Sequence, residues 1–262
     1  MNFLVLVGAR LIKLFANITK VLSYVFHWMF PRKRFTLPKE AGPLWRGQHP
    51  EGGIPRIIWQ TNFTDQCTLP VYLNYLFNRL ISPTYSYRFH ITADRHAYIA
   101  EHYGEDVLSL YERLQIGAAQ ADLWRVLMLY REGGVYLDID AHVVRPLERI
   151  LRPEDTEAYV LTRRGDVSNY FFASRAGNPN LKAIMELILH NIGNPQGNNV
   201  FDITGPGTFN RVLDLSQVKL CYYKHTCAQG TFTNEYFQYI DKKEGKWTKQ
   251  QDTVSVVRRD ES

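Results

Sequence analysis

The sequence predicts an α/β fold, a mainly parallel twisted sheet flanked by helices, because strand-like and helix-like segments alternate along most of the chain. With 262 residues, of which 45% are hydrophobic, the chain is long enough for one domain with a sizeable core. Strands are expected at 56–60, 85–92, 135–140, 158–161 and 170–174. Helices are expected at 69–80, 94–103, 107–114, 118–131, 179–190 and 209–213.

The clearest local pattern is a helix followed directly by a strand. Residues 118–131 are good helix formers, and the pair Gly133 and Gly134 then ends the helix. In residues 135–140, apolar and polar side chains alternate with the period of a β-strand. The apolar set can therefore face a core while the polar set stays accessible.

Two aspartates, Asp138 and Asp140, lie on the polar face of this strand, about 7 Å apart at Cα. Like charges at that distance repel each other and raise each other's pKa. A hard divalent cation such as Mg²⁺ or Mn²⁺ would neutralise them, and it would leave coordination sites for a substrate phosphate. A solvated strand end that leads into a turn is the structural alternative.

The surrounding residues make the pattern more specific. The order A-x-x-x-D-x-x-R, then G-G-x-Y-x-D-x-D, resembles the core signature of glycosyltransferase family 32, the D-x-D sugar-binding transferases. Initiating mannosyltransferases and bacterial capsule and lipopolysaccharide transferases belong to that family, and the clostridial glucosylating toxins share the signature. The signature residues here are Ala118, Asp122, Arg125, Gly133, Gly134, Tyr136, Asp138 and Asp140. The resemblance is clear over 54–147 and weaker to about residue 232, and Ala121 replaces a frequent serine.

This resemblance implies a GT-A type nucleotide-sugar-binding fold and a metal-dependent retaining glycosyltransferase. The donor would be a nucleotide-diphosphate sugar and the acceptor a glycan or a lipid-linked saccharide, as in surface polysaccharide or lipopolysaccharide synthesis. Asp138 and Asp140 would hold Mn²⁺ or Mg²⁺, and Asp138 would also touch the ribose or sugar. Asp122 and Arg125 would bind donor-sugar hydroxyls, although a simple i,i+3 ion pair explains the same spacing. Tyr136 is included in the expected nucleotide-sugar site.

The stretch that begins the globular body adds further candidates. Residues 54–61 resemble the family's opening I-P-x-x-I-x-Q-T, which implies that Trp59, Gln60 and Thr61 contact the nucleotide. A buried strand tryptophan followed by a polar turn is the structural alternative. Asn169 resembles a residue that lines the donor and acceptor cleft in relatives, or it simply begins a strand.

Three later positions are expected at the site on weaker motifs. Gly205 lies in a T-G-P loop, where the absence of a side chain lets the backbone approach a ligand. His225 and Thr231 resemble a late H-x-x-x-G-S-W element that reaches the diphosphate and metal in relatives, with a longer spacer and Phe232 in place of tryptophan. An ordinary helix-start turn and a structural histidine are the alternatives.

The N-terminus differs in charge from the rest of the chain. The net charge is +5, and six of the 31 basic residues but none of the 26 acidic residues lie in 1–34. The remainder is therefore nearly neutral, which argues against a nucleic-acid-binding body. Polar residues fall on one face of an apolar helix at Arg10, Lys13, Asn17 and Lys20.

This pattern predicts a helix that lies in a membrane interface and meets anionic lipid. We therefore divide the chain into an amphipathic membrane-associating helix at 1–34, a Pro- and Gly-containing linker at 35–53, and a glycosyltransferase domain at 54–262.

Three cysteines without a C-x-x-C pair indicate reduced thiols. The expected location is the cytoplasmic face of a membrane, most simply a bacterial inner membrane. A Golgi type II protein with a spanning anchor is the alternative.

Two other functions are compatible with a D-x-D after an apolar strand. A phosphatase of the haloacid dehalogenase type also has this motif, and Asp166 imitates its later acidic residue. The spacing from Asp140 is too short for the intervening helices of that fold, which disfavours this alternative. A membrane protein that binds nucleotide sugar without turnover is the second alternative.

Overall fold

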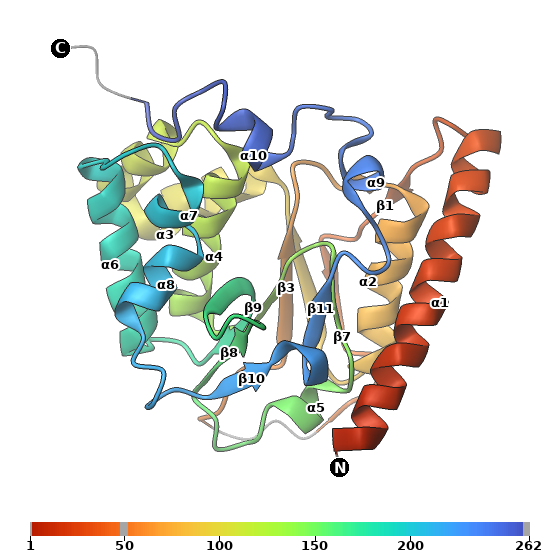
Figure 1. Ribbon diagram of the computed structural model, residues 1–262. Helices are drawn as coiled ribbons and strands as arrows, with labels where there is room; N and C mark the ends of the chain where they lie inside the picture. The colour runs from red at the N-terminus through yellow and green to blue at the C-terminus, as the bar shows by residue number, and fades with distance from the viewer. Residues whose placement is uncertain (1, 48–51, 259–262) are drawn as a thin grey trace.

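A seven-stranded mixed sheet lies at the centre of the molecule (Figure 1). The computed structural model describes residues 2–47 and 52–258. The strand order across the sheet is β10 (Leu220–Tyr222), β8 (Glu157–Leu161), β9 (Val167–Ser174), β6 (Gly134–Leu137), β3 (Ile57–Thr61), β5 (Ser86–His90) and β2 (Glu40–Ala41). Only β9 and β2 run opposite to the other five strands. The predicted mainly parallel sheet is confirmed.

Two short ribbons accompany this sheet. β1 (Phe35–Thr36) pairs with β4 (Gln66–Cys67), and β7 (Ala141–Val143) pairs with β11 (Cys227–Gln229), both antiparallel. The β7–β11 ribbon brings the C-terminal part of the chain beside the turn that follows β6.

Helices cover both faces of the sheet (Figure 1). One face carries α3 (Thr92–Arg113), α4 (Gly117–Glu132), α6 (Pro179–Gly193), α7 (Val200–Ile203) and α8 (Pro206–Val212). The other face carries α2 (Leu69–Ile81), and α1 (Asn2–Met29) lies outside α2. The short helices are α5 (Leu147–Ile150), η1 (Tyr223–His225), α9 (Glu235–Tyr239) and α10 (Trp247–Gln250).

Alternation along the strands divides the core into two layers. Trp59, Tyr136 and Phe172 belong to the cluster on the α4 side, and their neighbours Val135 and Phe171 belong to the cluster on the α2 side. Because each central strand is buried on both faces, its sequence is apolar with few polar interruptions, as expected for parallel sheets covered by helices.

Several predicted elements differ in extent from the observed ones. The two helices expected at 94–103 and 107–114 form the single element α3, which is interrupted where Gly104 has a φ of +75°. The strand expected at 135–140 ends at Leu137, because the Ala141 amide donates to the Asp138 carbonyl (2.9 Å) and closes a turn. The two aspartates are therefore presented by a turn and not by a strand.

The segment expected as a linker packs against the body over part of its length. It contributes β1 and β2, and the side chain of Leu37 between them is buried. Each of the three predicted units includes residues outside the described part of the chain, namely 1, 48–51 and 259–262. The division of the chain into these units stays a prediction.

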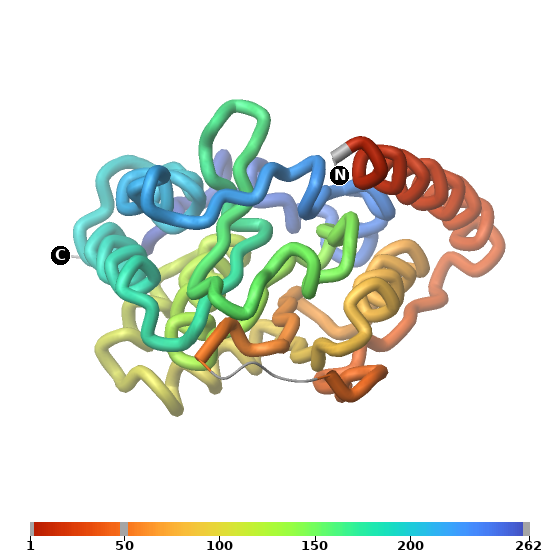
Figure 2. The backbone as a smooth tube through the Cα atoms, turned by 90° about the horizontal axis from the view of Figure 1, so that it is seen from below, coloured from red at the N-terminus to blue at the C-terminus, as the bar shows by residue number. Residues whose placement is uncertain are grey.

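The N-terminal helix runs along the outside of the body, as the view from below shows (Figure 2). Its buried positions are small or polar, namely Ala16, Thr19, Ser23 and His27. Within the described residues, no helix combines the length and the apolar composition needed to cross a membrane.

The junction between α4 and β6 depends on a glycine. Gly133 has a φ of +69°, and a Cβ on it would lie 2.8 Å from the backbone nitrogen of Ala176. The Gly133 carbonyl also accepts a hydrogen bond from Trp59 Nε1 (3.0 Å). The backbone at residue 133 can therefore lie this close to Ala176 only when residue 133 has no side chain.

We expect Gly133→Ala to be much more destabilising than Gly177→Ala. Both glycines have a φ of +69°, but a Cβ on Gly177 would meet no atom within 4 Å. The positive φ costs alanine about 1–2 kcal/mol at either position. The clash at Gly133 adds about 1–3 kcal/mol. Urea unfolding of the two variants measures the difference, and equal losses would show that the close approach is not a constraint.

Candidate functional site

A cavity of about 540 Å³ opens at the carboxyl ends of β3, β5 and β6. Its size lies within the range of small-molecule sites. Ligands commonly bind at this edge of an open α/β sheet. Of the residues expected at a nucleotide-sugar site, the cavity is lined by Thr61, Arg125, Tyr136, Asp138 and Asp140.

The two aspartates of the turn share one hydrogen-bond donor. Gln229 Nε2 donates to Asp138 Oδ2 and to Asp140 Oδ1, both at 3.0 Å. Gln238 Nε2 donates to the second oxygen of Asp140 at 2.9 Å. An amide carries no net charge, so it does not neutralise the pair. Burial and the neighbouring Asp138 accordingly raise the pKa of Asp140 to about 6.

The other side of Asp138 faces a buried cation. Arg125 Nη1 lies 3.0 Å from Asp138 Oδ1, and the Tyr136 hydroxyl donates to the same oxygen at 2.8 Å. The guanidinium also lies over the Tyr136 ring, 4.3 Å from its centroid. The Arg125 side chain is only 6% exposed, so these contacts are formed largely out of water.

Asp122 completes this network behind Arg125. Its Oδ1 lies 3.1 Å from Arg125 Nη2 and accepts from Asn169 Nδ2 at 2.9 Å. Its Oδ2 accepts from the Thr204 hydroxyl at 3.1 Å. Burial, and to a smaller extent Asp138, raises the pKa of Asp122 to about 6, although Arg125, Thr204 and Asn169 act in the opposite direction. Neither Asp122 nor Asn169 lines the cavity.

The opening strand of the body supports the site from behind. Gln60 Nε2 donates to the backbone carbonyl of Asp138 (3.1 Å), while Tyr87 donates to Gln60 Oε1 (3.0 Å). Trp59 lies in the core and donates to Gly133, and it does not line the cavity. Thr61 does line it and donates to the His90 carbonyl (2.6 Å). The expected nucleotide contacts of Trp59 and Gln60 stay predictions.

The three positions expected from weaker motifs lie elsewhere. Gly205 is the N-cap of α8, and a Cβ there would lie 3.0 Å from the Val200 carbonyl, which is a packing constraint. His225 and Thr231 line a second cavity next to α1, outside the site described above. Their expected contacts to diphosphate and metal stay predictions.

Two glutamines at the centre of the site were not singled out from the sequence. Gln229 lies within segment 225–232, in which the family resemblance indicated only His225 and Thr231. Gln238 lies on the short helix α9, 98 residues after its partner Asp140. Glutamine is common on surfaces, so no local signal distinguishes these two.

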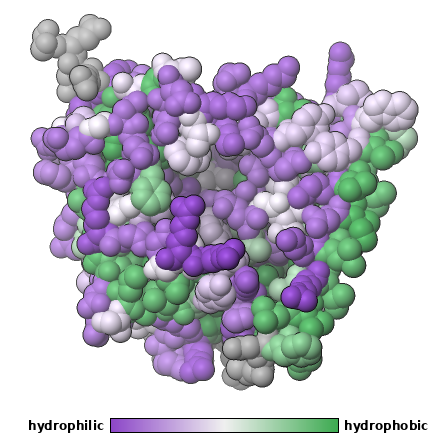
Figure 3. Space-filling model, viewed as in Figure 1, coloured by the Kyte–Doolittle hydropathy of each residue, from purple (hydrophilic) through white to green (hydrophobic). Residues whose placement is uncertain are grey.

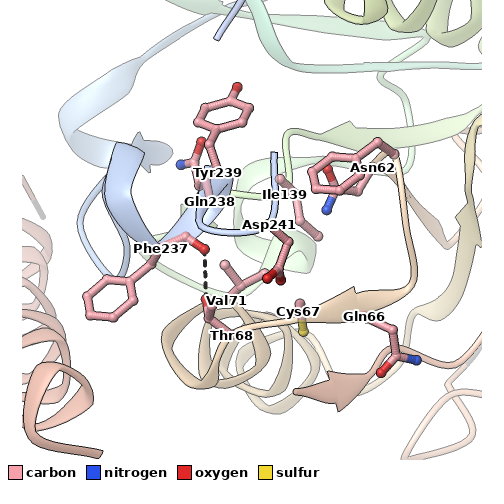
Figure 4. Close-up of a pocket in the computed structure, with 11 residues that line it drawn as sticks. Asn62, Gln66, Cys67, Thr68, Val71, Ile139, Phe237, Gln238, Tyr239 and Asp241 are labelled. Atoms are coloured by element: carbon pink, nitrogen blue, oxygen red, sulfur yellow. Dashed lines mark hydrogen bonds between the residues drawn. The ribbon is translucent and has the colours of Figure 1, made fainter. Parts of the chain in front are cut away.

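The segment that carries Gln238 is attached to α2. Figure 4 shows a small cavity of about 40 Å³ beside the site, in which Gln238 and Tyr239 lie near Ile139. The Thr68 hydroxyl donates to the Phe237 carbonyl at 3.0 Å, drawn as a dashed line. This bond holds the start of the segment beside the aspartate turn.

The turn that carries Asp138 and Asp140 suits a divalent ion, because it offers two protein ligands and leaves the other coordination positions open. No cluster of three His, Cys, Asp or Glu side chains that could hold a metal occurs within residues 2–47 and 52–258. Asp138 and Asp140 would therefore provide two carboxylates, and substrate phosphate and water would supply the remaining oxygens, as Mg²⁺ sites usually do. A cation there would require Gln229 to turn its amide oxygen toward it, because the amide nitrogen is only a donor.

We expect Arg125→Lys to lower the free energy of unfolding by about 2–4 kcal/mol. One ammonium group cannot replace contacts to Asp122 and Asp138 together with hydrogen bonds to the carbonyls of Ala121 (3.2 Å) and Asn169 (2.9 Å). Arg211→Lys is the matched control, since Arg211 pairs with an aspartate at the surface (2.9 Å) and should change stability by less than about 0.5 kcal/mol. Chemical denaturation compares the two, and similar small losses would contradict the assigned network.

Comparisons with known proteins agree with this arrangement. Residues 70–157 match the family described as glycosyltransferase sugar-binding region containing DXD motif. The fold is similar to the PaToxG glycosyltransferase, at 19% identity and a TM-score of 0.51, over 63% of this chain and 70% of that chain. The predicted GT-A type architecture is thereby confirmed.

More distant similarity extends to two other solved structures. One is the UDP-bound glycosyltransferase domain of the YGT toxin, at 14% identity and a TM-score of 0.39, over 56% of this chain and 54% of that chain. The other is a glycosyltransferase involved in glycosylation of the major capsid of PBCV-1, at 9% identity and a TM-score of 0.35, over 76% and 98%. No curated protein matched the chain. The family match over residues 70–157 includes the paired aspartates and the arginine behind them, so this part of the chain is similar to the glycosyltransferase sugar-binding region that contains the DXD motif.

Proposed function

We propose that the protein transfers a sugar from a nucleotide-diphosphate sugar to a saccharide or lipid-linked saccharide acceptor, in surface polysaccharide or lipopolysaccharide synthesis. The observation that carries this proposal is the pair Asp138 and Asp140, which meet at the carboxyl edge of the sheet on a cavity of about 540 Å³. Retention of anomeric configuration is what the family resemblance implies.

In this proposal Asp138 and Asp140 hold Mn²⁺ or Mg²⁺. When bound, the cation would stabilise the negative charge that the leaving diphosphate gains as the glycosidic bond breaks. Lys242 and Lys246 from the C-terminal segment line the same cavity, as does Arg95 behind Thr61. These cationic side chains would attract the diphosphate and orient it toward the aspartate turn.

Arg125 would bind hydroxyls of the donor sugar, because it lines the cavity. Asp122 and Asn169 would act through it, since they hold the guanidinium from the side away from the cavity.

The phosphatase alternative receives no support from the site. Asp166 lies in the turn between β8 and β9, where it accepts hydrogen bonds from Thr162. It does not line this cavity.

The outer face of α1 supports a peripheral membrane location. Its exposed apolar side chains include Phe3, Leu4, Leu11, Leu14, Phe15, Ile18, Val21, Leu22, Val25 and Trp28. A green, hydrophobic strip runs along the right edge of Figure 3, where this helix lies. The helix is fixed to the body through polar contacts, such as the Leu69 amide donating to His27 Nε2 (3.1 Å), and through aromatic contacts, such as that of Tyr24 with Phe237 (ring centroids 4.5 Å apart). Most of its apolar side chains therefore stay exposed. Continuous exposed apolar surface of this kind marks membrane or protein contacts.

Asp140→Asn and Asp138→Asn should each reduce turnover of nucleotide sugar by at least about a hundredfold. Each variant removes one of the two carboxylates that would hold the cation. Asp214→Asn, a change at an exposed aspartate outside the cavity, is the control and should retain wild-type turnover. Product release from a panel of nucleotide sugars is measured with and without Mn²⁺, and Mn²⁺ binding is measured by calorimetry. Undiminished Mn²⁺ binding and turnover in Asp140→Asn would refute the metal site.

Leu11→Gln combined with Leu22→Gln should weaken binding to anionic lipid vesicles by about tenfold or more, because each change removes apolar surface from the outer face. These leucines are 62% and 60% exposed, so folding should be unaffected. Leu44→Gln combined with Leu80→Gln is the matched control, since these leucines are 50% and 70% exposed and neither belongs to α1. Vesicle co-sedimentation separates the pairs, and equal retention of vesicle binding by both would exclude α1 as the anchor.

A further inference from the structure

A second cavity, of about 690 Å³, lies between the N-terminal half of α1 and the segment that joins β10 to β11. One wall is formed by α1 through Arg10 and Lys13, and the opposite wall is formed by η1 through Tyr223 and Lys224. The cavity is therefore bounded on one side by the helix whose outer face is apolar.

The charges around this cavity are of one sign. Arg10, Lys13 and Lys224 line it, and no acidic residue does so within the part of the chain that the structure describes. None of the three has an ion-pair partner among those residues. Burial, and the neighbouring charge of Lys13, lower the pKa of Lys20, which lies about two helical turns after Lys13 on α1. Unpaired cations that converge on a hollow favour an anionic ligand.

The inner wall supplies a neutral polar group. His142 on β7 is 1% exposed, lines the cavity, and has an Nδ1 atom without a hydrogen-bond partner in the described structure. Burial lowers the pKa of His142 to about 4, so the ring is neutral at pH 7. A buried imidazole without a partner is costly unless a ligand or water satisfies it.

The two cavities adjoin at one residue. Gln229 lines both, and its amide is the group that bridges Asp138 and Asp140. A molecule in the second cavity could therefore extend past Gln229 toward the aspartate turn. The apolar face of α1 lies along the outer side of the same wall, where a lipid chain could continue into a bilayer.

We propose that the second cavity binds the phosphate group of a lipid-linked acceptor, with Arg10, Lys13 and Lys224 holding the phosphate and the attached saccharide directed past Gln229. This inference rests on the proposed transferase function and adds the location and chemical class of the acceptor. The lipid chain lies along the apolar face of α1, and the aromatic side chain of Tyr223 covers the headgroup.

Vesicle binding in the absence of nucleotide sugar tests this site. Full-length protein is titrated with phosphatidylcholine vesicles that contain either a saccharide linked to a polyprenyl chain through a diphosphate, or phosphatidylglycerol, at equal total surface charge. We expect about tenfold tighter binding to the diphosphate-linked lipid, because its diphosphate carries two charges and more free oxygens at one point than the phosphodiester of phosphatidylglycerol. Arg10→Gln, Lys13→Gln and Lys224→Gln together should abolish this preference. Lys224→Gln alone, which leaves α1 unchanged, should reduce it about threefold to fivefold.

Arg32→Gln combined with Lys33→Gln is the matched control, since both residues are basic, exposed and outside the cavity. This control should weaken binding to both kinds of vesicle equally and keep the preference. Equal affinity of the wild-type protein for the two vesicles, or a preference that survives in Lys224→Gln and in the triple variant, would overturn the proposal. Competition by inorganic phosphate alone that matches the lipid would show a free-anion site and would also overturn it. Because no donor is present, these outcomes are independent of Mn²⁺-dependent turnover, which tests the transferase function separately.

Discussion

The site depends on one buried cation, the guanidinium of Arg125. A charge removed from water must be paired, and Arg125 is paired on two sides, with Asp122 on its own helix and with Asp138 on the turn after β6. Its hydrogen bond to the Asn169 carbonyl adds a third element, β9. Helix, turn and strand are thereby held in one arrangement, and the same charge partly offsets the repulsion among the carboxylates. Asp140 lies beyond the direct contacts of Arg125, which is consistent with its raised pKa.

The C-terminal part of the chain connects this site with the N-terminal helix. Gln229 and Gln238 bind the aspartates, and the residues between them contact α1. Lys20 donates to the Gly230 carbonyl (3.1 Å), and Asn234 donates to the Tyr24 hydroxyl (2.6 Å). The helix is therefore part of the framework that positions both glutamines, and a protein without α1 would lose contacts next to the site as well as its apolar outer face.

The amphipathic character of α1 is arranged differently from that of an ordinary surface helix. Such a helix buries its apolar face and exposes its polar face. Here the buried face contains Ala16, Ser23 and His27, and the large apolar side chains are outside. Polar contacts are directional, so they fix the rotation of the helix about its axis, which the apolar pattern alone would not do. Most side chains of the resulting apolar face are exposed, and the face borders the cationic cavity.

The sequence by itself determined the α/β class and the helix and glycine stop before β6, and it predicted the aspartates as the centre of the candidate site. These features rest on local spacing, such as the i,i+3 pair Asp122 and Arg125, or on a motif confined to one segment. Only the tertiary structure decided that the strand ends before Asp138, and that Trp59 is a core residue behind the site. It also placed His225 and Thr231 on the second cavity, and Gln229 and Gln238 on the aspartates. The physical reason is that these contacts join residues about 90 positions apart. Such contacts form only when the whole chain packs, and they produce no periodic pattern in the sequence.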